Sequence, residues 1–219
     1  MPRLLFEKTG NAVWISHLDL MRAFQRSFKR AQLPLTHTQG FNPRPSVSIA
    51  LPLSVGVESH CELLDFDLDG YDISFDEIQK RLNEALVTGV KVLDVYPDGR
   101  KIRDLSLLRC NIQLLYDNGI ADNAADTIGE LFARDEVIVS KKTKRGIQDQ
   151  NIVTMIRRLH INKEEENTLA VDCLICCQNP TLNPAQIPTA IEQYLPELKP
   201  SHYKCCRIEV YDNNETIFR

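Results

Sequence analysis

The chain has 219 residues, of which 43% are hydrophobic and 26% charged, and its formal net charge is -4. These values are typical of a globular protein with one large or two small domains. No apolar stretch is long enough for a signal peptide or a membrane span, because Glu7 and Lys8 follow directly on Leu4-Leu5-Phe6. We therefore expect a cytoplasmic protein that has no membrane contact and whose seven cysteines are not a disulfide framework.

The first part of the chain predicts strands and helices in alternation. Strands are expected at residues 4–8 and 12–15, on either side of a polar turn at Gly10. A helix begins at Ser16, because its hydroxyl can cap the first turn while Asp19 occupies the acidic position of a capping box. The next elements are strands at 47–51 and 61–68, a helix capped by Ser74, and a strand at 90–96. Strand, helix, strand, strand, helix, strand is the ferredoxin-like order.

The same order recurs after a turn-rich linker that begins at Pro97. Its predicted elements are a strand at 105–116, a helix near 122–133, strands at 136–140 and 168–177, a helix near 185–195 and a strand at 203–211. Residues 141–163 interrupt this second copy with a basic run at 141–146 and a short helix near 152–158.

Element order, rather than any repeat of residues, indicates the domain organisation. We predict an α+β protein made of two tandem ferredoxin-like (βαββαβ) units with antiparallel sheets. The first unit covers residues 1–97 and the second covers 104–219, with its insertion near 141–163.

Positive charge is concentrated in the first fifty residues, which hold seven lysines and arginines against two acids. Three of these cations form one stripe on the side of the predicted helix away from its phenylalanines, namely Arg22, Arg26 and either Lys29 or Arg30, and all four are candidate contacts for RNA or a partner. Such a row suits the phosphates of RNA, because each neutralised phosphate releases a counterion. It is equally compatible with a solvated helix face that forms weak ion pairs with Asp19.

A conformationally restricted loop follows this helix, with the sequence Thr38-Gln39-Gly40-Phe41-Asn42-Pro43-Arg44-Pro45. Its prolines restrict the backbone, so its side chains have little ordering entropy left to lose on binding. A fixed aromatic ring beside an amide and a guanidinium can stack on an exposed base and hydrogen-bond it. The predicted contacts for RNA or a protein partner are Gln39, Phe41, Asn42 and Arg44. The alternative is a structural turn that inserts Phe41 into the core.

Two histidines raise the possibility of catalysis. His17 stands at the first helical position, and His37 lies in the following loop. As an acid–base pair they could cleave an RNA phosphodiester without a metal ion. The alternative is that both are hydrogen-bonding surface or cap residues.

Cysteines in the second half raise the possibility of a metal site, because Cys173 and Cys176 form a Cys-x-x-Cys pair and Cys205 and Cys206 follow later. Both groups lie within predicted strands, where Cys110 would join them from an intervening strand as small buried apolar residues. We therefore assign no metal ligand and no cofactor to this chain.

Several segments together resemble the bacterial radical-SAM-linked family, a domain of unknown function. The matching segments are Ile15–Arg22, Arg26, Leu33-Pro34-Leu35, Gln39–Pro45 and Ala50–Gly56. Members of that family occur alone or fused behind a radical SAM and cobalamin-type enzyme. The resemblance implies an accessory or substrate-presenting role for such an enzyme, and it supplies no catalytic residues.

The leading hypothesis is therefore a non-catalytic RNA-binding or substrate-presenting module that works with a radical SAM enzyme in the modification of a structured RNA. In a protein-only version, the same basic surface docks on the acidic surface of the enzyme. The alternative from a different class is a metal-independent endoribonuclease that uses His17, with His37 as a possible second group.

Overall fold

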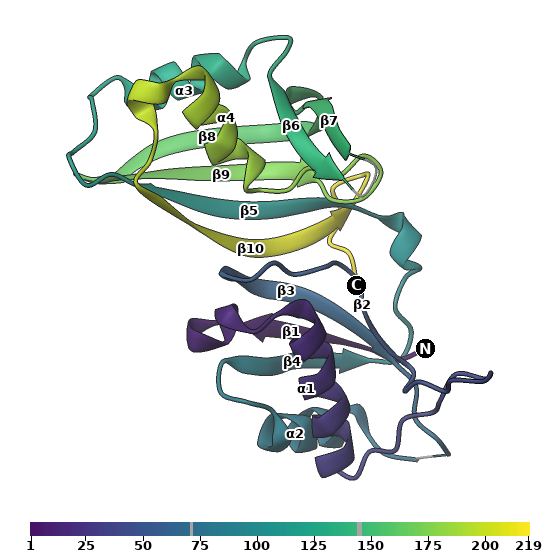
Figure 1. Ribbon diagram of the computed structural model, residues 1–219. Coiled ribbons are helices and arrows are strands. Elements are labelled where there is room, and N and C mark those ends of the chain that lie inside the picture. The colour runs from purple at the N-terminus through teal and green to yellow at the C-terminus, as the bar shows by residue number, and fades with distance from the viewer. Residues whose placement is uncertain (71, 144–145) are drawn as a thin grey trace. The chain divides into compact units, whose positions relative to one another are not determined.

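The computed structural model describes residues 1–70, 72–143 and 146–219 (Figure 1). Contacts within the chain divide it into two compact units. Unit 1 comprises Met1–Asp104 together with Arg219, and unit 2 comprises Leu105–Phe218. Both units combine helices with antiparallel strand pairs, which confirms the predicted α+β class.

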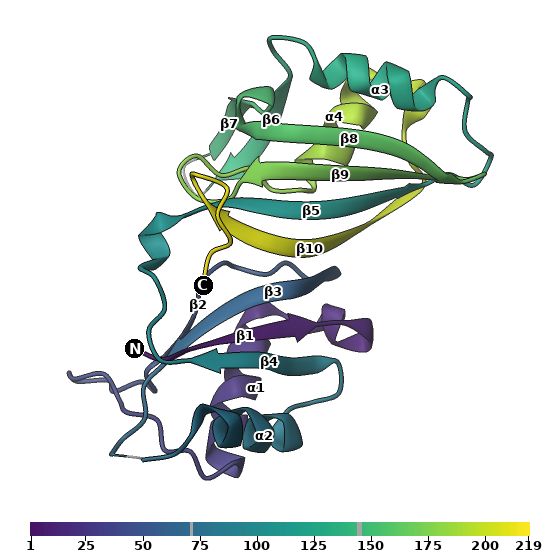
Figure 2. The ribbon, with the colours of Figure 1, turned by 180° about the vertical axis from the view of Figure 1, so that it is seen from behind.

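Unit 1 packs its helices against an antiparallel sheet. Its elements are β1 (Arg3–Lys8), the 3-10 helix η1 (Gly10–Trp14), α1 (His17–Arg30), β2 (Val47–Ile49), β3 (Val57–Phe66), α2 (Phe75–Ala85), β4 (Val90–Tyr96) and the 3-10 helix η2 (Ile102–Asp104). The strands lie in the order β4-β1-β3, and β2 pairs with one end of β3. α1 lies in front of the sheet in Figure 1 and behind it in Figure 2.

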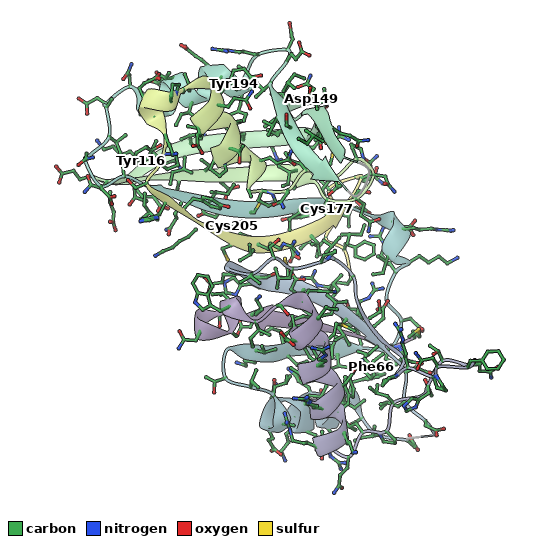
Figure 3. All side chains as sticks on the ribbon, viewed as in Figure 1. Phe66, Tyr116, Asp149, Cys177, Tyr194 and Cys205 are labelled. Carbon is green, nitrogen blue, oxygen red and sulfur yellow. The ribbon has the colours of Figure 1, made fainter. Side chains whose placement is uncertain are left out.

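The core of unit 1 lies between its helices and one face of the sheet. α1 contributes Leu20, Phe24 and Phe28, which are fully buried and four residues apart. The ring of Phe24 meets that of Phe6 edge-on at 4.7 Å, and the ring of Phe28 lies 5.2 Å from that of Phe66, which is labelled in Figure 3. Burial of this side leaves the opposite side of α1 available for charged residues.

Residues 12–14 of the segment predicted as a strand at 12–15 belong instead to η1, and Ile15 follows that helix in an extended conformation. The Lys8 side chain is fully buried, and its Nζ donates hydrogen bonds to the carbonyls of Val13 and Ile15, each at 3.1 Å. These bonds direct both carbonyl groups toward the Lys8 amine of β1. In a regular sheet strand, the carbonyl groups would instead accept hydrogen bonds from a neighbouring strand. A short apolar window in the sequence gives no sign of this buried amine, which is why the strand prediction was wrong.

Ser16 caps α1 as predicted, because its hydroxyl oxygen accepts the backbone N–H of Asp19 at 3.2 Å. The same hydroxyl donates to a carboxylate oxygen of Asp19 at 2.7 Å, and this bond, assisted by Arg22, lowers the pKa of Asp19. We expect Ser16→Ala to lower the free energy of unfolding by about 1 kcal/mol at neutral pH.

The pH dependence gives this prediction a second measurement. In Ser16→Ala, an NMR titration should show the pKa of Asp19 closer to its ordinary value. A carboxyl group whose pKa is lower in the folded than in the unfolded protein stabilises the fold at pH values above its unfolded pKa. This stabilisation is lost as the pH falls through the pKa of the folded protein. The stability difference between wild type and variant should therefore narrow in acid. A difference that widened in acid would contradict the assignment.

Unit 2 has a longer antiparallel sheet and a separate hairpin. Its elements are β5 (Leu105–Leu115), α3 (Ala124–Phe132), β6 (Ile138–Thr143), β7 (Gly146–Asn151), the 3-10 helix η3 (Val153–Met155), β8 (Ile156–Glu165), β9 (Thr168–Cys176), α4 (Gln186–Tyr194), the 3-10 helix η4 (Pro196–Leu198) and β10 (His202–Asp212). The strands run in the order β10-β5-β9-β8, while β6 pairs with β7 alone. Within the described residues, no helix has the length and apolar character needed to cross a bilayer.

The structure corrects the predicted second strand of this unit. The sheet strand is β8, whereas the residues predicted as a strand at 136–140 contribute to the β6–β7 hairpin. The predicted helix near 152–158 is only the short η3. β8 was missed because most of its side chains are exposed and polar, so that pairing with β9 rather than apolar alternation defines it. Lys144 and Arg145 of the basic run lie outside the described residues.

Candidate functional site

The predicted cations of α1 lie on its solvent-facing side, opposite the buried phenylalanines. Arg22 is 63% exposed and pairs with Asp19 at 3.0 Å, so part of its charge is already compensated within the helix. Arg26 and Lys29 are exposed and take part in no ion pair within the described residues. These two side chains therefore offer positive charge to a ligand at the smallest cost in broken contacts.

Arg30 has a different role from the other three. Its Nη2 donates to the carbonyl of Ala85 and to the hydroxyl of Ser27, and that hydroxyl also donates to Ala85. Ala85 ends α2, where carbonyl groups lack helical partners and favour a positive charge. Arg30 thus fastens α1 to the end of α2, and it is less available to a ligand than the sequence suggests.

The predicted loop is a projecting hairpin, which we call the Thr36–Ser46 hairpin (Figure 1). At its base, the Ser46 N–H donates to the Thr36 carbonyl and the Thr38 N–H donates to the Arg44 carbonyl, both at 2.8 Å. The hydroxyl of Thr36 donates to a carboxylate oxygen of Asp67 at 2.9 Å and ties the hairpin to the end of the sheet. The base is therefore fixed by hydrogen bonds to neighbouring backbone and side chains.

The tip of this hairpin is open to solvent. Gln39, Phe41, Asn42 and Pro43 are all exposed, and Gly40 has a φ of 132°, which favours glycine. The relative exposure of Phe41 is 112%, so insertion of this ring into the core, the alternative left open by the sequence, is wrong. An aromatic ring presented in this way has both faces available for stacking.

A groove of about 570 Å³ lies between the C-terminal half of α1 and the base of the hairpin. Its apolar lining consists of Phe28, Leu33, Pro34, Leu35 and Pro45. Polar side chains from both segments complete it, among them Lys29 from the helix and His37 from the hairpin. The sequence placed Lys29 and His37 in separate hypotheses, and the structure brings them together.

The groove contains only one of the two histidines, since His17 is not among its described lining residues. His37 shares the groove with residues from Gln25 onward, whereas His17 begins α1. Eight residues of helix rise separate His17 from Gln25, which is roughly 12 Å. The buried Nδ1 of His17 finds no hydrogen-bond partner among the described residues.

Three thiols of unit 2 cluster in its core. The strand carrying Cys110 lies between those carrying Cys173 and Cys205, and the Sγ atoms of Cys110 and Cys173 are 3.5 Å apart. The hydrogen bond with Cys173, together with burial, raises the pKa of the Cys110 thiol well above its ordinary value. Cys177 lies beyond the end of β9, away from Cys205 on β10 (Figure 3). Within the described residues, no three His, Cys, Asp or Glu side chains are arranged to hold a metal ion.

The fold and these surfaces define an α+β protein with a basic helix, a projecting hairpin and an apolar groove in its N-terminal unit. A model of the family described as uncharacterized proteins conserved in bacteria (DUF2344) matches residues 2–184. The chain belongs to this family. The family is bacterial and uncharacterised, which agrees with the resemblance seen in the sequence. The link to radical SAM enzymes stays a prediction.

A solved structure is similar to this chain at the level of the fold. A chain of a Cbf5–Nop10–Gar1 complex superposes with a TM-score of 0.52 at 8% sequence identity, covering 95% of this chain and 48% of that chain. The protein thus spans about half the length of that chain. An unknown protein from Galdieria sulphuraria aligns over 96% of each chain, at 9% identity and a TM-score of 0.26. No protein of curated function matches the sequence.

Proposed function

We propose that each unit is a ferredoxin-like module. In unit 1 the elements follow the order β1, α1, β2, β3, α2, β4, and the strand pairings place the first strand between the fourth and the third. In unit 2, β5, α3, β8, β9, α4 and β10 follow the same order once the β6–β7 hairpin is set aside, and β5 lies between β10 and β9. These two parallels support a tandem arrangement.

We further propose that the protein is a non-catalytic RNA-binding module that presents RNA to a radical SAM enzyme. The observation that carries this proposal is the fully exposed Phe41 at the tip of a hairpin with a hydrogen-bonded base. Burial would normally stabilise an aromatic ring, and its presentation to solvent on a fixed base favours a stacking partner. Exposed cations lie on α1, at Arg26 and Lys29, and on the hairpin, at Arg44. They can bind the phosphates that flank a base stacked on the ring.

The proposed enzyme partner rests on the sequence resemblance alone. In such a complex, the protein would hold the RNA while the partner supplies the chemistry, and the chain itself would contribute no catalytic residue or cofactor. An acidic surface of the enzyme is the competing ligand for the same cations. The test below therefore uses RNA in the absence of any enzyme.

The test measures binding of the whole chain to a short single-stranded RNA of mixed sequence and to bulk tRNA over a salt series, by fluorescence anisotropy. We expect Arg22→Ala/Arg26→Ala to weaken binding and to reduce the slope of log affinity against log salt by about 0.7 for each lost phosphate contact. Phe41→Ala should lower affinity about tenfold or more with an unchanged slope, and Phe41→Trp should retain it.

A matched control removes the same charge elsewhere in unit 1. Lys91 and Lys101 are exposed and lie outside α1 and the hairpin, so Lys91→Ala/Lys101→Ala should leave the RNA affinity close to that of the wild type. Equal affinities and equal slopes for the two double variants would overturn the proposal. So would a wild type that binds neither RNA at low salt, and the basic surface would then be assigned to a protein partner.

A further inference from the structure

The groove beside α1 has the chemistry of a site for a flat heterocycle. Its apolar lining combines the buried Phe28 and Leu33 with Leu35 and two prolines. A volume of about 570 Å³ falls within the range of small-molecule sites, which combine an apolar lining with a few polar groups. The apolar surface can cover the faces of a base while polar groups at the rim reach its edge.

The polar groups of the groove favour an anionic ligand that also carries amide-like edges. They are Gln25, Lys29, Gln32 and His37, and the lining residues that the structure describes include no aspartate or glutamate. The glutamine amides can donate to and accept from a base, and the ammonium of Lys29 attracts a phosphate. Arg26 lies one residue beyond Gln25 on α1 and extends the positive charge along the helix.

The backbone at Gln32 supplies an independent observation. Gln32 has a φ of 56°, in the left-handed region, where α1 ends in a Schellman motif. The Leu33 N–H donates to the Phe28 carbonyl at 2.9 Å, and the Gln32 N–H donates to the Lys29 carbonyl at 3.2 Å. Glycine or asparagine is usual at this position, so a glutamine here carries backbone strain. Its side chain is exposed and lines the groove, so this strained residue is accessible from the groove.

We propose that this groove binds one unpaired nucleobase of the RNA, with Gln32 contacting the base edge and Lys29 the adjoining phosphate. The inference rests on the proposed RNA-binding function and adds base selection to it. His37 and Phe41 belong to the same hairpin, so a base in the groove and a base stacked on Phe41 would be held by one fixed element.

The test compares the binding of poly(A), poly(U) and poly(C) to the wild type, Gln32→Gly and Lys29→Ala. Gln32→Gly relieves the left-handed strain and should raise the melting temperature by about 3 °C, so any loss of binding cannot be ascribed to unfolding. We expect it to lower affinity for the preferred polymer about tenfold and to reduce the differences among polymers, with an unchanged salt slope. Lys29→Ala should instead reduce the slope by about 0.7. Gln148→Ala changes an exposed glutamine of unit 2 and should leave all of these values unchanged.

The outcomes separate this inference from the function on which it rests. If the wild type binds RNA through Arg22 and Arg26 but Gln32→Gly keeps both affinity and polymer preference, the base site is overturned and RNA binding stands. If the wild type binds none of the three polymers, both proposals fall. A lower melting temperature for Gln32→Gly would remove the strain argument, which is one of the two supports of the site.

Discussion

Replacing Lys8 with methionine is expected to lower the free energy of unfolding of unit 1 by about 3 kcal/mol. Methionine fills a similar volume, but it cannot donate to the carbonyls of Val13 and Ile15. The Ile15 carbonyl would then lose the donor that the buried amine provides, and an unsatisfied buried acceptor is costly, whereas the Val13 carbonyl would keep its bond from the Gly56 N–H at 2.8 Å. Because these carbonyls immediately precede α1, the loss would also loosen the start of the basic helix.

Urea unfolding can measure this effect within unit 1. The single tryptophan of the chain, Trp14, lies in η1, so its fluorescence reports the segment that Lys8 holds. Lys91→Met is the matched control, because Lys91 is exposed on β4, and it should change the stability by less than about 0.5 kcal/mol. A Lys8→Met variant as stable as this control would show that the buried amine is not needed for η1.

Arg3→Met is expected to destabilise unit 1 by about 3 to 5 kcal/mol, because it removes one partner of a largely buried ion pair. Arg3 is 2% exposed and donates to both carboxylate oxygens of Asp65, at 2.6 and 3.2 Å. Space for the guanidinium is provided by Gly99, where a Cβ would lie 2.3 Å from the Arg3 Cζ. Removal of the arginine would leave the carboxylate without this partner in the strand pair β1–β3.

Urea unfolding followed by circular dichroism would measure the change, and a second variant identifies its cause. Arg3→Met/Asp65→Leu replaces both charges with apolar groups and should recover most of the lost stability, because no unpaired charge then remains. Arg103→Met is the control, since Arg103 is 76% exposed. If the double variant were less stable than Arg3→Met alone, an unpaired Asp65 would not be the source of the loss.

The helices and strands with strong local signals could be predicted from the sequence. Ser16 marked the start of α1 because capping depends on residues only three positions apart, and β4 has the predicted bounds of 90 and 96. η1 and β8 could not be predicted in this way. Lys8 determines η1 through a buried amine, and β8 is defined by pairing with β9, so both depend on tertiary contacts.

The individual residues of the candidate site could be predicted from the sequence, but the groove that they form could not. The exposed Phe41 and the cations Arg26 and Lys29 lie in the segments that charge and proline content had indicated. The groove was missed because its lining is assembled from a helix and a hairpin whose relative position depends on the turn at Gln32. A glutamine with left-handed backbone angles after a helix C-cap cannot be recognised from the sequence, because glycine or asparagine is the usual residue at that position.

Phe28 connects the groove to the interior of unit 1, because it belongs to the hydrophobic core and also lines the groove. Its neighbour Phe66, labelled in Figure 3, contacts that ring from β3 and does not itself line the groove. Tightly packed interiors transmit changes in volume to their neighbours. A smaller core residue at position 66 would leave space beside the Phe28 ring, so that Phe28 could shift inward and the groove would deepen. Substitutions in the core can therefore change the depth of the groove while every surface residue stays the same.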